Sequence, residues 1–137
     1  MRDLLFDAVR AACEGRAHLQ AAIVFGSATV SEKPGDLDLA LLWDEALGVP
    51  ERFRLGNEIA ADIEHRIADT GLTVDQKDLR ELPLSLKFRV LREGVRVSVP
   101  DRRALVRFQS LTVPMALDFL PFQDRALRES ARRLAGG

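Results

Sequence analysis

Two short apolar runs separated by a polar loop constrain the fold of this chain most. The first is His18-Leu-Gln-Ala-Ala-Ile-Val-Phe25, which ends at Gly26, and the second is Asp36-Leu-Asp-Leu-Ala-Leu-Leu-Trp43. A short apolar run bounded by glycine or turn residues is typical of a buried strand. The two runs therefore predict neighbouring elements of a sheet, with a polar connection between them.

Helical periodicity and breaker residues organise the rest of the chain. Apolar spacing predicts helices over residues 3–14, 50–70 and 83–94, followed or closed by glycines. Residues 72–78 and 95–99 predict two further strands, and the chain from residue 101 is expected to be helical, with Pro114 and Pro121 kinking or dividing it. This order predicts a single α/β (α+β) domain over residues 1–137, with a core of about 1–99 and a helical C-terminal arm over 100–137.

Composition excludes several classes of protein. The formal net charge of −1 argues against coating nucleic acid through bulk electrostatics, so direct nucleic-acid binding is not expected. No run of about 18 uncharged apolar residues occurs, and acidic residues interrupt any signal-peptide core, so no membrane association is expected. The single cysteine, Cys13, permits no intramolecular disulfide. Together these features predict a cytoplasmic protein.

Two carboxylates stand in the second apolar run. Asp36 and Asp38 are two residues apart on a predicted strand, so both side chains leave one face while the leucines between them leave the other. Adjacent carboxylates repel each other unless they share a cation. A hard divalent ion such as Mg²⁺ meets that need, because it takes carboxylate oxygens and leaves room for phosphate. The alternative is a polar strand start after the turn at Pro34-Gly35.

Gly26-Ser27 and a third carboxylate extend this candidate site. Glycine lets the backbone approach a phosphate, and free N–H groups with a serine hydroxyl supply donors, although Ser27 would serve equally as a helix N-cap. Asp75 can complete the site if the strand over 72–78 pairs beside Asp36 and Asp38. Asp78 is a competing candidate that would face the opposite way. Three carboxylates can hold two metal ions, and Asp75 could accept the proton of an attacking hydroxyl.

The combination resembles the Gly-Ser…Asp-x-Asp signature of the DNA-polymerase-β-type nucleotidyltransferase superfamily, and its size and layout resemble the minimal nucleotidyltransferase (MNT) proteins. The similarity spans most of the chain, from the N-terminal helix through the helix that ends at Arg92-Glu-Gly94 to the helical tail. It implies a polymerase-β-like nucleotidyltransferase fold, with a small mixed sheet flanked by helices. It also implies that the triphosphate is bound by Gly26 and Ser27, and that Mg²⁺ binding and catalysis fall to Asp36, Asp38 and Asp75.

The resemblance further implies a reaction and a partner. Members of this family transfer a nucleoside monophosphate, commonly AMP from ATP, to a hydroxyl group. In type VII-like HEPN/MNT toxin–antitoxin modules the acceptor is a tyrosine of the HEPN-domain toxin. The chain is therefore expected to be the antitoxin, to use Mg²⁺ and ATP, and to form a hetero-oligomer with a HEPN-type toxin that it neutralises.

One segment departs from the family's pattern. Related proteins usually carry an arginine or a second glycine after Gly-Ser, whereas this chain has Ala28-Thr-Val-Ser31 and no basic residue before Lys33. Lys33 is the expected nucleotide-binding substitute, although its flexible stem does not reproduce a forked contact. The departure favours a second hypothesis, a binding module with weak or no activity that neutralises its toxin by contact. A third is a small-molecule nucleotidyltransferase of the aminoglycoside type, which the short chain disfavours because little of it remains to enclose an acceptor.

The C-terminal region carries more apolar residues than one exposed helix needs. They include Leu111, Met115 and Phe119. Such a surface either closes the core of the domain itself or contacts a partner, and the antitoxin hypothesis predicts that part of it contacts the toxin.

Overall fold

The computed structural model describes residues 1–29, 35–120 and 132–134 of the chain. Its helices and strands follow the predicted order, with small shifts at their ends. They are α1 (Arg2–Cys13), β1 (Leu19–Phe25), β2 (Leu37–Trp43), α2 (Val49–Arg66), β3 (Val74–Asp78), α3 (Leu84–Glu93), β4 (Val95–Ser98) and α4 (Arg102–Phe119). Short 3₁₀ helices follow three of them: η1 (Gly26–Thr29), η2 (Ala68–Thr70) and η3 (Leu79–Glu81).

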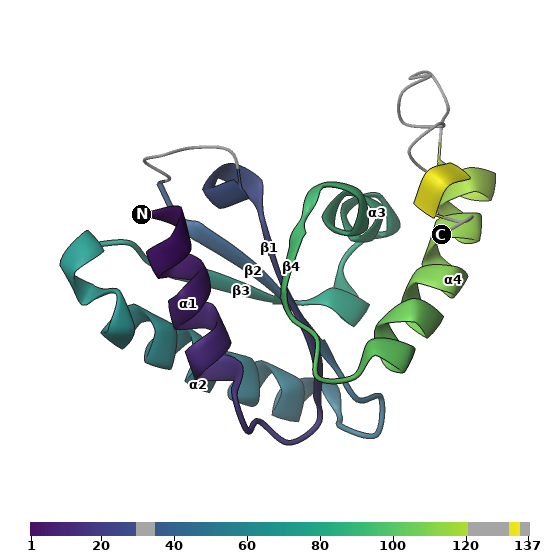
Figure 1. Cartoon of the computed structure of the whole chain (residues 1–137). Coiled ribbons are helices and arrows are strands. Elements are labelled where there is room, and N and C mark those ends of the chain that lie inside the picture. Colours follow the sequence, from purple (N-terminus) through teal and green to yellow (C-terminus); the bar gives the residue numbers. More distant parts are fainter. Residues whose placement is uncertain (30–34, 121–131, 135–137) are drawn as a thin grey trace.

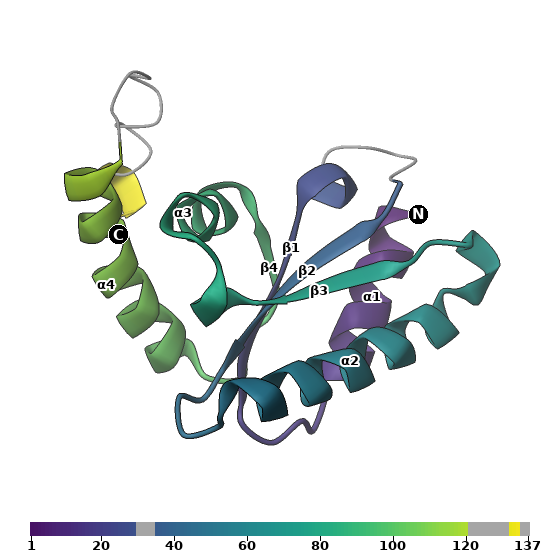
Figure 2. The same ribbon diagram turned by 180° about the vertical axis from the view of Figure 1, so that it is seen from behind.

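The strands of the described residues form one mixed sheet with the order β3-β2-β1-β4. β1 pairs antiparallel with both β2 and β4, whereas β2 pairs parallel with β3. A parallel pair needs a long crossover, and α2 supplies it (Figure 2). The predicted small mixed sheet and the α/β (α+β) class are therefore confirmed.

Helices cover both faces of the sheet, with α1 and α2 on one side and α3 and α4 on the other (Figure 1). The packing of β2 between these two layers explains why its sequence is almost continuously apolar. Leu37, Leu39 and Leu41 lie in the core cluster under α1 and α2, whereas Ala40 and Leu42 lie in the cluster under α3 and α4. A strand that is buried on both faces carries apolar residues at nearly every position. Asp38 is the one charged residue in β2.

α4 continues through Pro114, so of the two expected effects of this residue, a kink or a division of the helix, division is wrong. Proline removes one helical hydrogen bond, which leaves the carbonyl of Ser110 without its usual donor. Both Ser110 and Pro114 are exposed, so water can reach that carbonyl. Pro121 lies outside the described residues.

Two expectations from composition can be compared with the structure. Within the described residues, no helix is both long enough and apolar enough to cross a bilayer. Cys13 is buried on α1, and this burial raises the pKa of its thiol to about 11. The thiol therefore stays protonated at neutral pH and is a weak nucleophile.

Candidate active site

The turn after β1 lies directly against the first residues of β2. The antiparallel register pairs Phe25 with Asp38, and Gly26 follows at once with a φ of 73°. A Cβ atom at position 26 would collide with the Asp38 carboxylate oxygen Oδ2. The left-handed backbone therefore favours glycine here, and a side chain at this position would fit only if the Asp38 carboxylate moved away. The turn continues as η1, in which the Thr29 hydroxyl donates to the Gly26 carbonyl at 2.8 Å.

The parallel register of β2 and β3 brings a second carboxylate to the same place. Asp38 is paired with Asp75, and neighbouring strands lie about 4.8 Å apart. Both side chains leave the face that α3 and α4 cover, since the residues flanking Asp38 pack under α1 and α2. Asp36 lies one residue before β2, and its Oδ1 accepts a hydrogen bond from the Thr73 hydroxyl at 2.9 Å. The three predicted acidic residues therefore lie at one edge of the sheet.

The charges at this edge are incompletely balanced. The pKa of Asp38 is raised, first because the carboxyl is partly buried and then because Asp75 and Asp36 carry like charges nearby. Lys77 opposes the rise, and its Nζ lies 3.5 Å from Asp75 Oδ1. Lys77 was not predicted from the sequence, although strand alternation from Asp75 would have identified it as a neighbour on the same face.

Asp78, the competing candidate, lies on the opposite face of β3. Its Oδ2 is 3.1 Å from Nε of Arg52 on α2, and its Oδ1 accepts from the Arg80 backbone N–H at 3.2 Å. Burial raises the pKa of Asp78, while the Arg52 guanidinium acts to lower it. Asp78 therefore links β3 to α2 and is separated from the carboxylates of Asp38 and Asp75 by the sheet.

The carboxylates have the chemistry to bind Mg²⁺ together with a phosphate-bearing ligand. Among the described residues, no three acidic, histidine or cysteine side chains come together closely enough to hold a metal ion by themselves. Mg²⁺ is usually bound by only one or two carboxylates plus phosphate oxygens and waters, so such a cage is not needed. The Asp38–Asp75 pair, with its raised carboxyl pKa at Asp38, fits a cation of this kind.

A cavity of about 730 Å³ opens beside the Gly26 turn and Asp38, but Asp36 and Asp75 are not among the residues that line it. Its volume lies in the range of small-molecule and cofactor sites. β1, η1 and β2 form one wall with Gly26, Ser27 and Asp38, all predicted from the sequence. α3 forms the other wall with Leu86, Arg89 and Glu93. The three α3 residues were not predicted, because nothing local in the sequence places α3 opposite the Gly-Ser turn. Lys33 lies outside the described residues.

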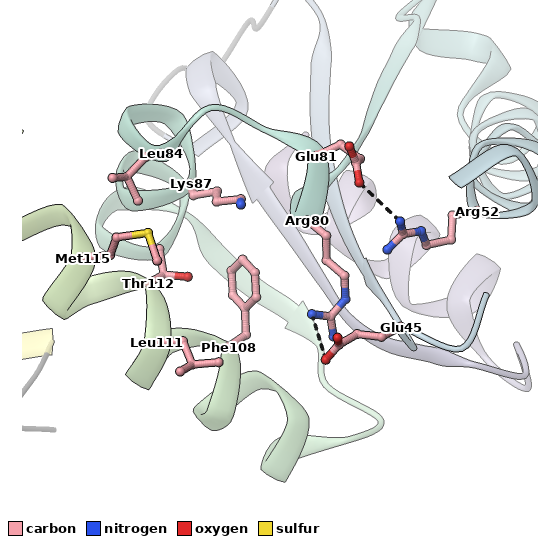
Figure 3. A pocket seen from close by; sticks show the side chains of 10 residues that line it. All are labelled: Glu45, Arg52, Arg80, Glu81, Leu84, Lys87, Phe108, Leu111, Thr112 and Met115. Carbon is pink, nitrogen blue, oxygen red and sulfur yellow. Dashed lines mark hydrogen bonds and ion pairs between the residues drawn. The ribbon is translucent and has the colours of Figure 1, made fainter. Parts of the chain in front are cut away.

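A second cavity, of about 420 Å³, lies beyond the far ends of β2 and β3 (Figure 3). Its two arginines already have hydrogen-bond or ion-pair partners. Arg80 donates from Nε to the Trp43 carbonyl at 2.7 Å and from Nη2 to Gln20 Oε1 at 3.0 Å, and Arg52 Nη2 lies 3.3 Å from Glu81 Oε1. These contacts tie the strand ends and α2 together. Of the predicted site residues that the structure describes, none lines this second cavity.

A mixed sheet that holds a glycine turn against Asp38, beside a cavity in the size range of small-molecule sites, is compatible with a nucleotidyltransferase-type domain. The family described as polymerase beta, nucleotidyltransferase matches residues 8–103, a span that includes Gly26, Asp38 and Asp75. The chain belongs to this family. A search among curated proteins finds no match.

Solved structures with the same fold come from toxin–antitoxin complexes. One is the tri-AMPylated HEPN toxin of Shewanella oneidensis in complex with MNT antitoxin, with 20% identity over 100% of both chains and a TM-score of 0.61. A toxin–antitoxin complex with AMP-PNP shares 20% identity over 99% of this chain and 98% of that one, with a TM-score of 0.58. The MntA–HepT complex shares 20% identity over 85% and 91%, with a TM-score of 0.54. The predicted polymerase-β-like nucleotidyltransferase fold is thereby confirmed.

Proposed function

We propose that this protein is an MNT-type antitoxin that transfers AMP from ATP to a hydroxyl, in the first place a tyrosine, of a HEPN-type toxin and so neutralises it. The observation that carries the proposal is the contact between the Gly26 turn and Asp38, beside Asp75 and at the wall of the 730 Å³ cavity. Support comes from solved structures of the same fold, one with an AMPylated HEPN toxin and one with AMP-PNP. The chain has no tyrosine, so a tyrosine acceptor must belong to another chain.

The side chains divide the work as follows. Asp38 and Asp75, with Asp36 beside them, would hold Mg²⁺, which when bound neutralises charge on the phosphate oxygens. The backbone at Gly26 and the Ser27 hydroxyl, both at the wall of the cavity, would donate hydrogen bonds to the triphosphate. Asp75, which is half exposed, would accept the proton of the acceptor hydroxyl while the hydroxyl oxygen bonds to the α-phosphorus and pyrophosphate leaves. Lys33, which was predicted from the sequence alone, would also bind the nucleotide.

The experiment is an AMP-transfer assay with the natural toxin partner. The protein, labelled ATP, Mg²⁺ and the toxin are incubated, and label on the toxin is measured together with toxin activity. Replacing either Asp36 or Asp38 by alanine is expected to lower transfer at least 100-fold, while Asp69→Ala, at an exposed acidic position on η2, serves as the control. Unchanged transfer in Asp38→Ala would remove the proposal.

The binding-module hypothesis makes a different prediction in the same assay. The run Ala28–Ser31, which lacks the basic residue usual after Gly-Ser, is the observation that favours it. Under that hypothesis the toxin is neutralised without label, and both aspartate variants neutralise it as well as the natural sequence does. Neutralisation that depends on ATP and on Asp38 would exclude it.

We also propose that the chain works in the cytoplasm, as a single domain with a core of about residues 1–99 and a helical arm over 100–137. The lone cysteine, which is buried and free, is compatible with a reducing compartment.

A further inference from the structure

We infer that Arg89 on α3 is the cation that binds the triphosphate of ATP in this protein, in place of the basic residue missing after Gly-Ser. The inference rests on the proposed function, because it assigns a phosphate-binding residue to the same cavity. Arg89 comes 62 positions after Ser27 in the sequence.

The cavity needs a positive charge that its first wall does not supply. The turn and η1 contribute backbone N–H groups and hydroxyls but no charge, and β2 contributes the negative Asp38. A triphosphate placed there would meet a carboxylate of like sign. Among the described residues that line the cavity, Arg89 is the only base, and Glu93 is the only other charged residue besides Asp38.

The fold holds α3 in the position that this role requires. Leu86, Arg89 and Glu93 recur at helical spacing on the cavity side, whereas Phe88 and Leu91 are buried in the core. The C-terminal end of the helix is closely packed, because a Cβ atom at Gly94 would meet Ile23 Cγ2 and the Val90 carbonyl at 2.5 Å. Arg89 thus extends from a helix fixed against β1 and lies across the cavity from Gly26 and Ser27.

The guanidinium of Arg89 is available for a ligand. Within the described residues it makes no ion pair or hydrogen bond. The adjacent Arg92 is occupied instead, because its Nη2 lies 2.6 Å from Glu93 Oε1 and its guanidinium stacks 5.8 Å from the Phe88 ring. A guanidinium presents two parallel donors that match phosphate oxygens, which an ammonium cannot do. Arg89 therefore provides the forked contact that Lys33 could not reproduce.

The test is a binding measurement that does not depend on turnover. Isothermal titration calorimetry with AMP-PNP and MgCl₂, and separately with adenosine, is carried out on the natural protein and on Arg89→Ala and Arg89→Lys. We expect Arg89→Ala to weaken AMP-PNP binding at least 10-fold and to leave adenosine binding within 2-fold. Arg89→Lys should recover part of the loss. Lys87→Ala, which removes one positive charge from the same helix on the side of the other cavity, should bind AMP-PNP normally.

The outcomes separate this inference from the proposed function. If the natural protein binds AMP-PNP and Arg89→Ala binds it equally well, the inference is wrong and the proposed function stands. If the natural protein binds no AMP-PNP, the proposed function and the inference both fall. A parallel loss of AMP-PNP and adenosine in Arg89→Ala, or an equal loss in Lys87→Ala, would contradict a specific contact with the triphosphate.

Discussion

At the residue scale, the Asp38 carboxylate lies so close to the Gly26 backbone that the two positions constrain each other sterically. Gly26 and Gly15 have nearly the same backbone conformation, with φ values of 73° and 72°. A Cβ atom at Gly15 would meet nothing within 4 Å, whereas one at Gly26 would collide with Asp38 Oδ2. The two glycines therefore form a matched pair in which only the collision with the carboxylate differs.

We expect Gly26→Ala to be more destabilising than Gly15→Ala. The left-handed conformation alone costs about 1 to 2 kcal/mol for a non-glycine residue, which should appear at both positions. The collision at Gly26 should add at least about 1 kcal/mol, or displace the Asp38 carboxyl. Urea unfolding measures both free energies of unfolding. Equal losses at the two sites would mean that the turn does not press on Asp38, and the double variant Gly26→Ala, Asp38→Ala should recover the added part.

Asp38 also predicts a pH dependence of stability. Its pKa is raised in the folded state by burial and by Asp75 and Asp36, so the charged carboxylate destabilises the fold at pH values above that raised pKa. Asp38→Asn should therefore melt at a higher temperature than the natural protein at pH 8. The difference should shrink as the pH falls and vanish below the ordinary aspartate pKa of about 3.9. Thermal unfolding followed by circular dichroism, with Asp69→Asn as control, measures the effect, and a constant difference across pH would contradict it.

At the element scale, α2 is joined to the end of β3 by a buried ion pair. The side chains of Arg52 and Asp78 are 8% and 12% exposed, with Arg52 Nε and Asp78 Oδ2 3.1 Å apart. Arg54, which lies two residues after Arg52 on the same helix, forms ion pairs with Glu51 and Glu58 on the exposed surface. The two arginines differ chiefly in burial, so they allow the contribution of a buried pair to be compared with that of exposed pairs.

We expect Arg52→Met to lower the free energy of unfolding by about 3 kcal/mol, because it leaves Asp78 buried and without its cation. The loss should diminish at acid pH, where Asp78 becomes neutral and no longer needs a partner. Arg54→Ala should leave stability unchanged within error, because exposed pairs contribute little. Chemical denaturation at pH 7.5 and pH 4.5 measures these quantities. A loss in Arg52→Met no larger than in Arg54→Ala would show that the buried pair does not hold α2 to β3.

At the scale of the whole molecule, one side of α4 is buried in the core, while other residues of the same helix are exposed. Leu105, Phe108 and Val113 are buried in the cluster that also contains Ile23 of β1, whereas Leu111 on the same helix is 67% exposed. The Phe108 ring also lies under two cations, 5.7 Å from the Arg80 guanidinium carbon and 6.0 Å from Lys87 Nζ. The described part of the C-terminal region therefore closes the second face of the sheet and still leaves an apolar stripe at Leu111, Met115 and Phe119.

Phe108→Ala should lower the free energy of unfolding by about 3 to 4 kcal/mol, because it opens a cavity and removes buried aromatic surface. Leu111→Ala should change it by less than about 0.5 kcal/mol, since that side chain is already in water. Guanidinium unfolding compares the two. A small effect of Phe108→Ala would mean that residues 100–137 form a separable arm on a self-sufficient core of about 1–99, and this division stays a prediction until then.

The sequence by itself determined the helices and strands, their order, and the part of the candidate site that lies between residues 26 and 38. Helical periodicity and short apolar runs are local properties, so α1 to α4 and β1 to β4 could be predicted with only small errors at their ends. Gly26, Ser27, Asp36 and Asp38 could be identified because they are close in the chain and belong to a connected motif. Their catalytic and binding roles stay predictions.

Only the tertiary structure decided which distant residues share the site. The parallel register of β2 and β3 placed Asp75 beside Asp38 and Asp78 on the other face, with Arg52. The packing of α3 placed Arg89 across the cavity from Ser27. Both outcomes depend on strand register and helix packing, which are set by long-range contacts between segments far apart in the chain. Strand alternation predicted that Asp75 and Asp78 face opposite ways, but local patterns carry no information on strand register or helix packing. A residue such as Arg89 therefore looks in the sequence like any exposed arginine on an amphipathic helix.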